Sequence, residues 1–308
     1  MNEALSHEAL EEKDIPKQIA LSVTLDQSSH LEIRNHPSIA IMLPTYREAQ
    51  NIENLIRDIQ KLNLNSSIVV IDDSSPDGTA KIIRRLQREY DNIILFVRPA
   101  KLGLGTAITA GFRLLLSLEN PPEYIVTMDS DYSHNPKDIS RLVNSAKRGN
   151  DLVIGSRYYH GGKTVGWPFA RRLISHVANL IATMLVNGKI QDCTSGFRCY
   201  SIDYVRSVIN NLHSQTYEIQ IESVKQAWTR KFRVDEVPIV FSNRKRGKSK
   251  LTKAEFRGFL AYVIKTKFGV TIPSADENIQ LKNGFSNAYS LDERIQRIID
   301  LYRQVRFF

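Results

Sequence analysis

The sequence predicts an α/β fold in which a mostly parallel central sheet is flanked by helices. Between residues 38 and 129, short apolar runs of strand length alternate with longer segments whose apolar residues recur at helical spacing. Such alternation is typical of a parallel sheet, because each helix carries the chain back to the edge where the next strand begins.

The elements are expected in a regular order. The strands are SIAIMLP (38–44), SIVVIDD (67–73), NIILFVR (92–98) and YIVTMD (124–129), and each is rich in β-branched residues. The helices are NIENLIRDIQKL (51–62), TAKIIRRLQREY (79–90) and GTAITAGFRLLLSL (105–118). Expected boundary residues are Asn51 and Thr79 at helix starts, with Pro44, Pro76 and Pro99 just past strands.

Polar clusters follow each of these strands. They are PTYRE, DDSSPDG, RPAKLGLG and DSDYSH. Ligands of open α/β sheets bind beyond the carboxyl ends of the strands, so we expect the four loops to meet at one ligand-binding rim.

The most informative cluster is the pair Asp129 and Asp131, which follows an apolar strand. Residues two apart in an extended chain point the same way, so both carboxylates can reach one cation. Mg²⁺ and Mn²⁺ are bound by one or two carboxylates together with substrate phosphate oxygens. The pair therefore favours a metal-bound nucleoside diphosphate, although Asp-x-Asp also occurs in solvated turns.

Two other clusters leave alternatives open. Asp72 and Asp73 could accept hydrogen bonds from a nucleoside, or they could form a turn before the next helix. Gly103 and Gly105 do not have the G-x-G-x-x-G spacing of a dinucleotide site, so we expect a tight turn near a nucleotide instead.

Composition narrows the class of protein. The chain has 308 residues, 42% of them hydrophobic and 24% charged, and a net charge of +9. The charge favours an anionic partner without choosing between nucleic acid, acidic lipid and a phosphorylated substrate. Two cysteines, Cys193 and Cys199, do not make a disulfide framework and fit a reducing compartment. No signal peptide or membrane span is indicated, which predicts a soluble or peripheral protein.

The second half of the chain supplies cations. They are Arg157, Arg171, Arg172, Arg198 and the run NRKRGKSKL from Asn243 to Leu251. Arginine binds phosphate through two parallel hydrogen bonds, so these residues suit a diphosphate, although a charge run is often only a solvated face. Nucleic acid is the competing partner, but stacking aromatic residues do not alternate with the cations, so it is not expected.

Together these motifs resemble a known family. PTYREAQN, VVIDDSSPDGT, KLGLGTAITAG, MDSDYSHNP, IGSRYYHGG, W-P-x-x-R-R-L-I-S-x-x-A-N, DCTSGFRCY and EVPIVFSNRKRGKSKL occur in the order seen in inverting family 2 glycosyltransferases. The resemblance, from about residue 39 to 269, is to the dolichol-phosphate (polyprenol monophosphate) mannosyltransferase group. It implies a GT-A fold, Mg²⁺ or Mn²⁺, a GDP-mannose donor and a polyprenyl phosphate acceptor at the cytosolic face of a membrane.

The resemblance also implies roles for individual positions. Asp129, Asp131 and Arg157 are expected at the catalytic centre, and Asp129, Asp131 and Ser133 at the metal, where relatives often have glutamine in place of serine. The expected donor-binding residues are Pro44, Tyr46, Glu48, Asp72, Asp73, Lys101, Asp129, Ser130, Arg171, Arg172, Arg246 and Lys248. Ser249 belongs to the same mobile segment over the diphosphate.

A phosphate acceptor would need no general base, because its second pKa near 6 leaves it largely dianionic at neutral pH. An alcohol acceptor would need a carboxylate such as Asp192, Glu218 or Glu222, which could equally be structural partners of the arginines. His134 is expected to have a structural or positional role. The alternatives are a related transferase that uses UDP-glucose, UDP-GlcNAc or a soluble acceptor, and a noncatalytic nucleotide-sugar-binding protein.

Three regions are expected: an N-terminal extension (1–37), a catalytic domain (38–270) and a C-terminal helical extension (271–308). Membrane contact is expected through 167–186 or 256–270, either of which could lie in the interface or pack on the core, or through a separate anchoring protein.

Overall fold

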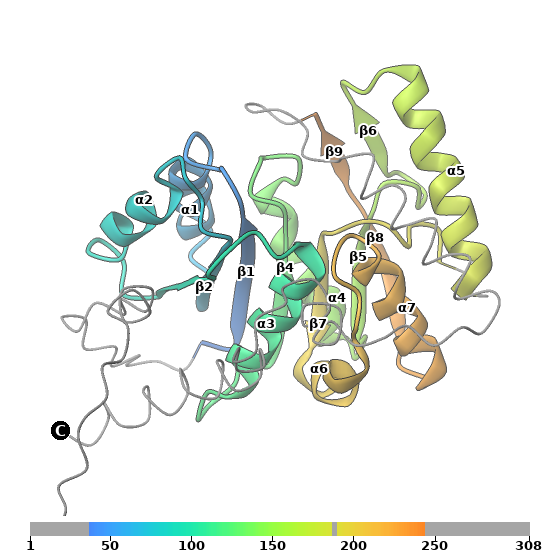
Figure 1. Cartoon of the computed structure of the whole chain (residues 1–308). Coiled ribbons are helices and arrows are strands. Elements are labelled where there is room, and N and C mark those ends of the chain that lie inside the picture. The colour runs from blue at the N-terminus through green and yellow to red at the C-terminus, as the bar shows by residue number, and fades with distance from the viewer. Residues whose placement is uncertain (1–36, 187–189, 244–308) are drawn as a thin grey trace, which may run out of the picture. The chain divides into compact units, whose positions relative to one another are not determined.

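The computed structural model describes residues 37–186 and 190–243. In this part of the chain, seven strands form one sheet in the order β3-β2-β1-β4-β7-β5-β8 (Figure 1). The strands are β1 (Ile39–Thr45), β2 (Ser66–Asp72), β3 (Ile93–Val97), β4 (Tyr124–Thr127), β5 (Leu152–Ser156), β7 (Arg198–Ser201) and β8 (Val234–Pro238). Only β7 runs antiparallel to its neighbours. The predicted α/β fold with a mostly parallel sheet is confirmed.

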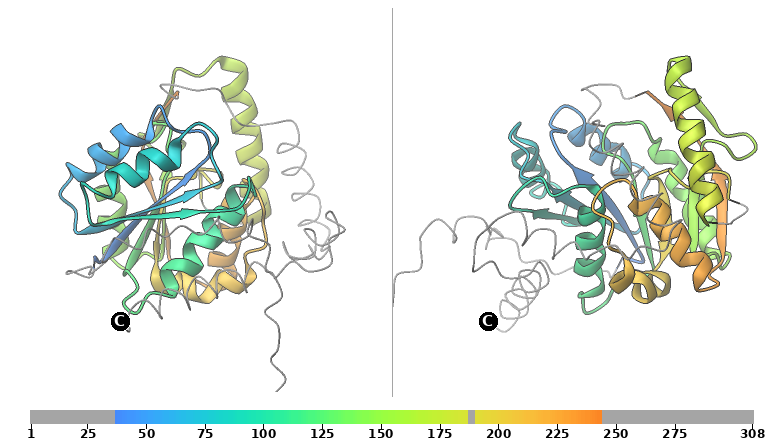
Figure 2. Two further views of the ribbon diagram at one scale, coloured as in Figure 1. Left: turned by 60° about the vertical axis from the view of Figure 1, so that its left-hand side comes forward. Right: turned by 45° about the vertical axis from the view of Figure 1, so that its right-hand side comes forward.

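Helices cover both faces of this sheet (Figures 1 and 2). One apolar core joins it to α1 (Ile52–Gln60), α2 (Thr79–Leu86) and α4 (Ile139–Lys147). The other joins it to α3 (Leu104–Leu116), α6 (Ile202–Val208) and α7 (Ile219–Thr229). Single-turn 3₁₀ helices at Pro136–Asp138 and Ile209–Asn211 precede α4 and follow α6.

The sequence of β1 shows how one strand serves two cores. Ile39, Ile41 and Leu43 lie in the core of α1, α2 and α4, whereas Ala40 and Met42 lie in the core of α3. Successive side chains of a strand point to opposite faces, so an uninterrupted apolar run is what a strand covered on both sides requires.

Pro44 differs from the expectation that it follows the strand, because it is the sixth of the seven residues of β1. The pairing of β1 with β4 ends at Met42, two residues earlier, so at Pro44 the strand is paired only with β2. A proline is tolerated there because the missing N–H is not needed on the unpaired side.

The helix α5 (Phe169–Val186) stands beside a second, two-stranded sheet of β6 (Lys163–Val165) and β9 (Val240–Ser242) (Figure 1). Its buried residues Asn179, Ala182 and Val186 lie on one face. At 3.6 residues per turn, most of its exposed apolar residues fall within roughly 80° on the opposite face. The exposed residues are Phe169, Leu173, Ile174, Val177, Leu180 and Met184. α5 thus carries an outward apolar surface, which we call the α5 apolar face.

Several sequence expectations lie outside the described residues. They are the extensions 1–37, apart from Pro37, and 271–308, the segment 256–270, and the residues Arg246, Lys248 and Ser249.

Candidate active site

The loops after β1, β2 and β4 and the start of α3 meet at one pocket beyond the carboxyl ends of the parallel strands. Its lining includes eight residues that the sequence predicts as a donor or metal site: Pro44, Tyr46, Glu48, Asp73, Lys101, Asp129, Ser130 and Asp131. Thr45, Gly103, Leu104, Ala107 and Tyr217 complete it. The expected convergence of the strand-end loops is therefore what the fold produces.

Backbone strain is concentrated in these loops. Arg47, Ser74 and Tyr132, which follow β1, β2 and β4, have φ values of 56°, 48° and 63°. Residues other than glycine seldom adopt this left-handed region, and they do so where the surrounding contacts hold them. Tyr132 is held by its hydroxyl, which donates to Asp58 Oδ2 at 2.8 Å.

Positive charge lies around the ring of Tyr46 at one side of the pocket. Lys101 Nζ is 5.2 Å and Arg47 Cζ 5.4 Å from the centroid of this ring. These are cation–π distances, so the ring and the two cations stabilise one another. Lys101 is the cation among the lining residues that the structure describes.

The neighbours Asp72 and Asp73 have different surroundings. Asp72 is fully buried and accepts hydrogen bonds from Thr45 Oγ1 and from the backbone and hydroxyl of Ser75. Asp73 lines the pocket, forms an ion pair with the buried Arg98, and accepts from Leu102 N. Burial raises the pKa of Asp73 above its usual value, against the opposing charge of Arg98. Asp72 stabilises the loop, and Asp73 is the one that can reach a ligand.

The metal-type pair is set by the loop after β4. Asp129 has a half-exposed side chain, while Asp131 is 7% exposed. Asp131 Oδ1 accepts from Ser133 N at 3.0 Å and from Ser133 Oγ at 2.5 Å. The Ser133 hydroxyl thus orients a carboxylate, and it does not line the pocket.

His134 helps to hold the same loop in place. Its Nδ1 accepts from the backbone N–H of Asp129 at 3.1 Å, and its ring stacks on Phe197 at 4.9 Å. Burial lowers the pKa of His134 to about 4, so the ring is neutral near pH 7. It is a positioning residue, as the sequence suggests.

Among residues 37–186 and 190–243, no three His, Cys, Asp or Glu side chains gather to hold a metal ion. Asp129 and Asp131 nevertheless suit Mg²⁺ or Mn²⁺, because these ions take one or two carboxylates and complete their shells with water and phosphate oxygens. The donor set at the pocket therefore fits a metal that arrives with a phosphorylated ligand.

Arg157 is not among the residues that line the pocket. It is 8% exposed and paired with the fully buried Asp192, to which its Nε and Nη2 donate at 2.8 and 2.7 Å. Its guanidinium also lies 5.2 to 5.9 Å from the ring centroids of Tyr158, Phe241 and Trp167. In this structure the side chain holds together the segments after β5 and before β7.

Three other arginines of the second half also lie away from the pocket. Arg198 is fully buried and donates to the carbonyl oxygens of Cys193, Ser195 and Gln220, so it does not face the pocket. Arg171 and Arg172 lie at the start of α5, where Arg171 packs over the Trp167 ring at 4.3 Å. None of the three lines the pocket. The sequence could not show this, because it does not distinguish an arginine that binds a ligand from one that binds backbone or packs on a ring.

The three carboxylates considered as bases hold structural contacts. Asp192 pairs with Arg157, Glu222 accepts from the backbone N–H groups of His213 and Ser214, and Glu218 accepts from Thr216. The interpretation as structural partners of arginines is confirmed for Asp192, whereas Glu218 and Glu222 hold backbone N–H groups instead.

Tyr217 is the site residue that the sequence analysis missed. It reaches the pocket because α3 begins against the segment before α7, where Gly105 N donates to Gln215 O at 2.9 Å. A Cβ on Gly105 would overlap the Ser214 carbonyl oxygen, so glycine is required by this close approach. An aromatic residue within the polar stretch HSQTYE is the signal that could have identified it.

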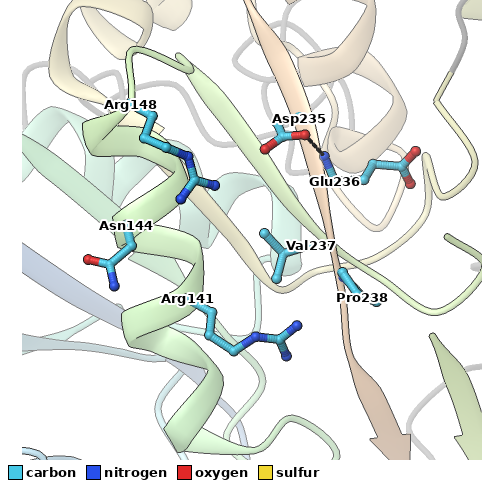
Figure 3. Close-up of a pocket in the computed structure, with 7 residues that line it drawn as sticks. All are labelled: Arg141, Asn144, Arg148, Asp235, Glu236, Val237 and Pro238. Atoms are coloured by element: carbon cyan, nitrogen blue, oxygen red, sulfur yellow. Dashed lines mark hydrogen bonds between the residues drawn. The ribbon is translucent and has the colours of Figure 1, made fainter. Parts of the chain in front are cut away.

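A second pocket lies between α4 and β8 (Figure 3). Arg141 and Asn144 of α4 and Arg148, just after it, line one side, and β8 lines the other, where the side chains of Asp235 and Val237 point toward α4 and that of Glu236 points away. Arg141 is paired with Asp138 at 2.7 Å, and none of the sequence-predicted site residues lines this pocket. The pocket beyond the parallel strands is thus the candidate active site.

Comparison with known proteins adds relatives to this geometry. The family model described as Glycosyl transferase family 2 matches residues 40–209. The chain is 35% identical over 219 residues to the polyprenol monophosphomannose synthase of Mycolicibacterium smegmatis, which covers 70% of this chain and 82% of that protein. It is 34% identical over 215 residues to the undecaprenyl-phosphate mannosyltransferase of Micrococcus luteus, with 70% and 87% covered.

The fold also has solved counterparts. Glucosyl-3-phosphoglycerate synthase from Mycobacterium tuberculosis, in complex with Mn²⁺, UDP-glucose and phosphoglyceric acid, superposes with a TM-score of 0.56 at 19% identity. The superposition covers 77% of this chain and 81% of the synthase chain. The expected GT-A fold is confirmed. No helix within residues 37–186 and 190–243 is both long and apolar enough to cross a bilayer.

Proposed function

The chain belongs to glycosyl transferase family 2, and from this premise we propose that it transfers mannose from GDP-mannose to a polyprenyl monophosphate, with inversion and with Mg²⁺ or Mn²⁺. That it is a glycosyltransferase follows from the family and from its relatives. The donor, the acceptor and the metal are the proposal.

The observation that carries the proposal is the charge of the pocket. Its described lining includes four carboxylates, Glu48, Asp73, Asp129 and Asp131, and one lysine, Lys101. A diphosphate and a carboxylate are both anionic, so carboxylates bind a diphosphate through a divalent cation that lies between them. The pocket therefore suits a nucleotide sugar bound with a metal better than a free anion.

We assign a role in donor binding to each residue according to its position in the pocket. Tyr46 and Asp73 bind the nucleoside, Lys101 contacts the diphosphate, and Asp129 and Asp131 would hold the metal. Pro44, Glu48 and Ser130 shape the wall beside them. The bound metal would neutralise charge that grows on the departing diphosphate. Mn²⁺ is present with UDP-glucose in the glucosyl-3-phosphoglycerate synthase that shares this fold, which is consistent with the proposed metal.

The acceptor class is supported by the carboxylates outside the pocket. Asp192, Glu218 and Glu222 hold structural contacts, so none stands ready to take a proton from an alcohol. A phosphate monoester needs no such base, because it is largely dianionic at neutral pH. Its oxygen would attack the anomeric carbon as the nucleoside diphosphate departs from the opposite face. Both curated relatives are named for transfer to a polyprenyl phosphate.

A lipid-linked acceptor requires contact with a membrane, and the α5 apolar face is suited to it. Phe169 is 73% and Met184 70% exposed, and Arg171 and Arg172 belong to the first turn. A helix with an outward apolar surface and flanking cations binds at the interface of an anionic bilayer. We propose that this contact is made at the cytosolic face of the membrane, which is the face that the family resemblance implies. An anchoring protein could take part in it.

The remaining cations have proposed roles that rest on resemblance alone. Arg157 would act on the sugar side, Arg171 and Arg172 would bind the phosphates of the nucleotide sugar, and Arg246 and Lys248 would lie over the diphosphate. Residues 38–270 would then form one catalytic domain, between extensions at 1–37 and 271–308.

The test is a transfer assay with the full chain, radiolabelled GDP-mannose, a polyprenyl phosphate and Mg²⁺ or Mn²⁺, which follows label into an organic phase. Label should move only when lipid phosphate and metal are both present, and Asp131→Asn should abolish transfer. Asp138→Asn is the matched control, because Asp138 lies nearby but pairs with Arg141 away from the pocket. Transfer without metal, or full activity of Asp131→Asn, would refute the proposal.

A further inference from the structure

Gly196, which has no side chain, lies beside Asp129 of the candidate active site. A Cβ added there would lie 3.5 Å from Asp129 Oδ1 and 3.6 Å from Gln220 Nε2. Both are ordinary contact distances, so the carboxylate and the amide flank one small space that glycine leaves open. Neither Gly196 nor Gln220 stands out in the sequence as a site residue.

Gln220 is buried at the start of α7. The residue is 2% exposed, and its Oε1 has no hydrogen-bond partner in the described part of the chain. An unpaired buried oxygen costs roughly 1–3 kcal/mol, so hydrogen bonds of this oxygen within the protein do not account for the position of the amide. The Nε2 of the same amide lies toward the space beside Gly196, where its N–H groups can donate to a ligand.

The surrounding contacts fix the two groups relative to each other. Arg198 donates to Ser195 O and to Gln220 O, both at 2.7 Å, and so joins the loop before β7 to the start of α7. Thr127 Oγ1 donates to Gly196 O at 3.0 Å and ties the same loop to the strand that leads into Asp129. The buried arginine thus holds one wall of the site in place.

The space between an amide N–H and a carboxylate favours a hydroxyl group. A hydroxyl oxygen can accept from Gln220 Nε2 while its proton is donated to Asp129, and a carboxylate accepts more than one hydrogen bond. A phosphate oxygen would bring negative charge against Asp129. A hydroxyl matches both neighbours, and it is the group that the transferred sugar carries.

We propose that Gln220 is a specificity-determining residue that binds one hydroxyl of the transferred sugar beside Asp129, and that Gly196 keeps the space for it open. The proposal rests on the proposed function, which supplies the sugar. It assigns sugar recognition to the start of α7, on the opposite side of Asp129 from the nucleotide loops.

The experiment compares kcat/KM for the native donor with kcat/KM for analogues that lack each sugar hydroxyl in turn. Wild type should lose roughly 10- to 100-fold for one analogue, since the groups that bound the missing hydroxyl are then left without a partner. Gln220→Met keeps length and bulk without the amide, and it should be slower with the native donor and indifferent to that same hydroxyl. Gly196→Ala fills the space and should show the same indifference.

Gln226→Met is the control, because Gln226 lies on the same helix and donates to Asn211 O away from the site. It should keep the wild-type pattern. Penalties in Gln220→Met and Gly196→Ala that match wild type at every hydroxyl would overturn the inference. If Gln220→Met does not fold by thermal denaturation, Gly196→Ala decides alone. Failure of the proposed function is distinct, because wild type would then transfer no sugar to polyprenyl phosphate.

Discussion

Asp192→Asn tests the interpretation that the pair of Arg157 and Asp192 is structural. Asp192 is fully buried, and it accepts from Arg157 Nε, Nη2 and backbone N at 2.8, 2.7 and 2.9 Å. It also accepts from the backbone N–H groups of Thr194 and Ser195. Asparagine has the same shape but turns an NH₂ group toward donors and leaves the guanidinium charge without a partner.

The expected loss is large for one substitution. Removal of one partner from a buried ion pair costs about 3–5 kcal/mol, because the remaining charge stays buried and uncompensated. A domain is stable by roughly 5–15 kcal/mol, so the variant should still fold but with much of its stability gone. Asp203→Asn is the control, since Asp203 has an 80% exposed side chain and pairs with Arg206 on the surface. It should change stability by less than about 0.5 kcal/mol.

The assay is urea denaturation of both variants and wild type over a pH series. Burial opposes ionisation of Asp192, but the charge and hydrogen bonds of Arg157 outweigh it and hold the pKa of Asp192 below its usual 3.8. A lowered folded pKa contributes stability that is present above the unfolded pKa and is lost as the pH falls through the folded value. Wild type should therefore lose this contribution below about pH 4, and Asp192→Asn should not.

Two results would refute this reasoning. One is a loss of less than about 1 kcal/mol at pH 7, which would mean that the guanidinium finds another partner. The other is an acid limb of the stability curve that is the same in Asp192→Asn and wild type.

Three further predictions follow from described contacts. Gly105→Ala should cost at least about 1–3 kcal/mol in urea denaturation, because its methyl group would overlap the Ser214 carbonyl, and unchanged stability would contradict that contact. Tyr132→Phe removes the hydrogen bond to Asp58, so it should lower the free energy of unfolding by about 0.5–1.5 kcal/mol. It should also lower the transfer rate, because the loop that carries Asp129 and Asp131 is held less firmly. A variant with wild-type stability and wild-type rate would contradict this prediction. Val177→Glu on the α5 apolar face should reduce co-sedimentation with anionic vesicles while GDP-mannose binding by calorimetry is unchanged, and undiminished sedimentation would exclude this face as the contact.

The first half of the fold was predictable because its pattern is local. Each strand from β1 to β4 is an apolar run, and each is followed by a polar cluster at the same edge, so the site loops could be located without knowing the packing. Asp129, Asp131 and Tyr46 were found for this reason. Asp72 and Asp73 were found as a pair, but only burial distinguishes the residue that faces the pocket.

The second half depends on contacts distant in sequence. β7 takes its place between β4 and β5 only through pairing, and RCYS has no pattern that predicts an antiparallel strand. Arg198 was grouped with the phosphate-binding cations because charge is visible in a sequence and burial is not. Tyr217 lines the pocket because the segment before α7 lies against the start of α3, and this contact between distant parts of the sequence is not encoded by a local pattern.

The position of β7 has a consequence for how the chain folds. β5 is synthesised before β7, yet within the sheet β4 and β5 are not paired with each other and each is paired with β7 (Arg198–Ser201). Until this segment arrives, the half-sheet of β1 to β4 has an open edge at β4, and an open strand edge can pair with other chains. Completion of the sheet is therefore a late, long-range step, of the kind that slows folding. Cys199 and Tyr200, fully buried in the finished sheet, pair with both neighbours and so join the half-sheet of β1 to β4 to the strands β5 and β8.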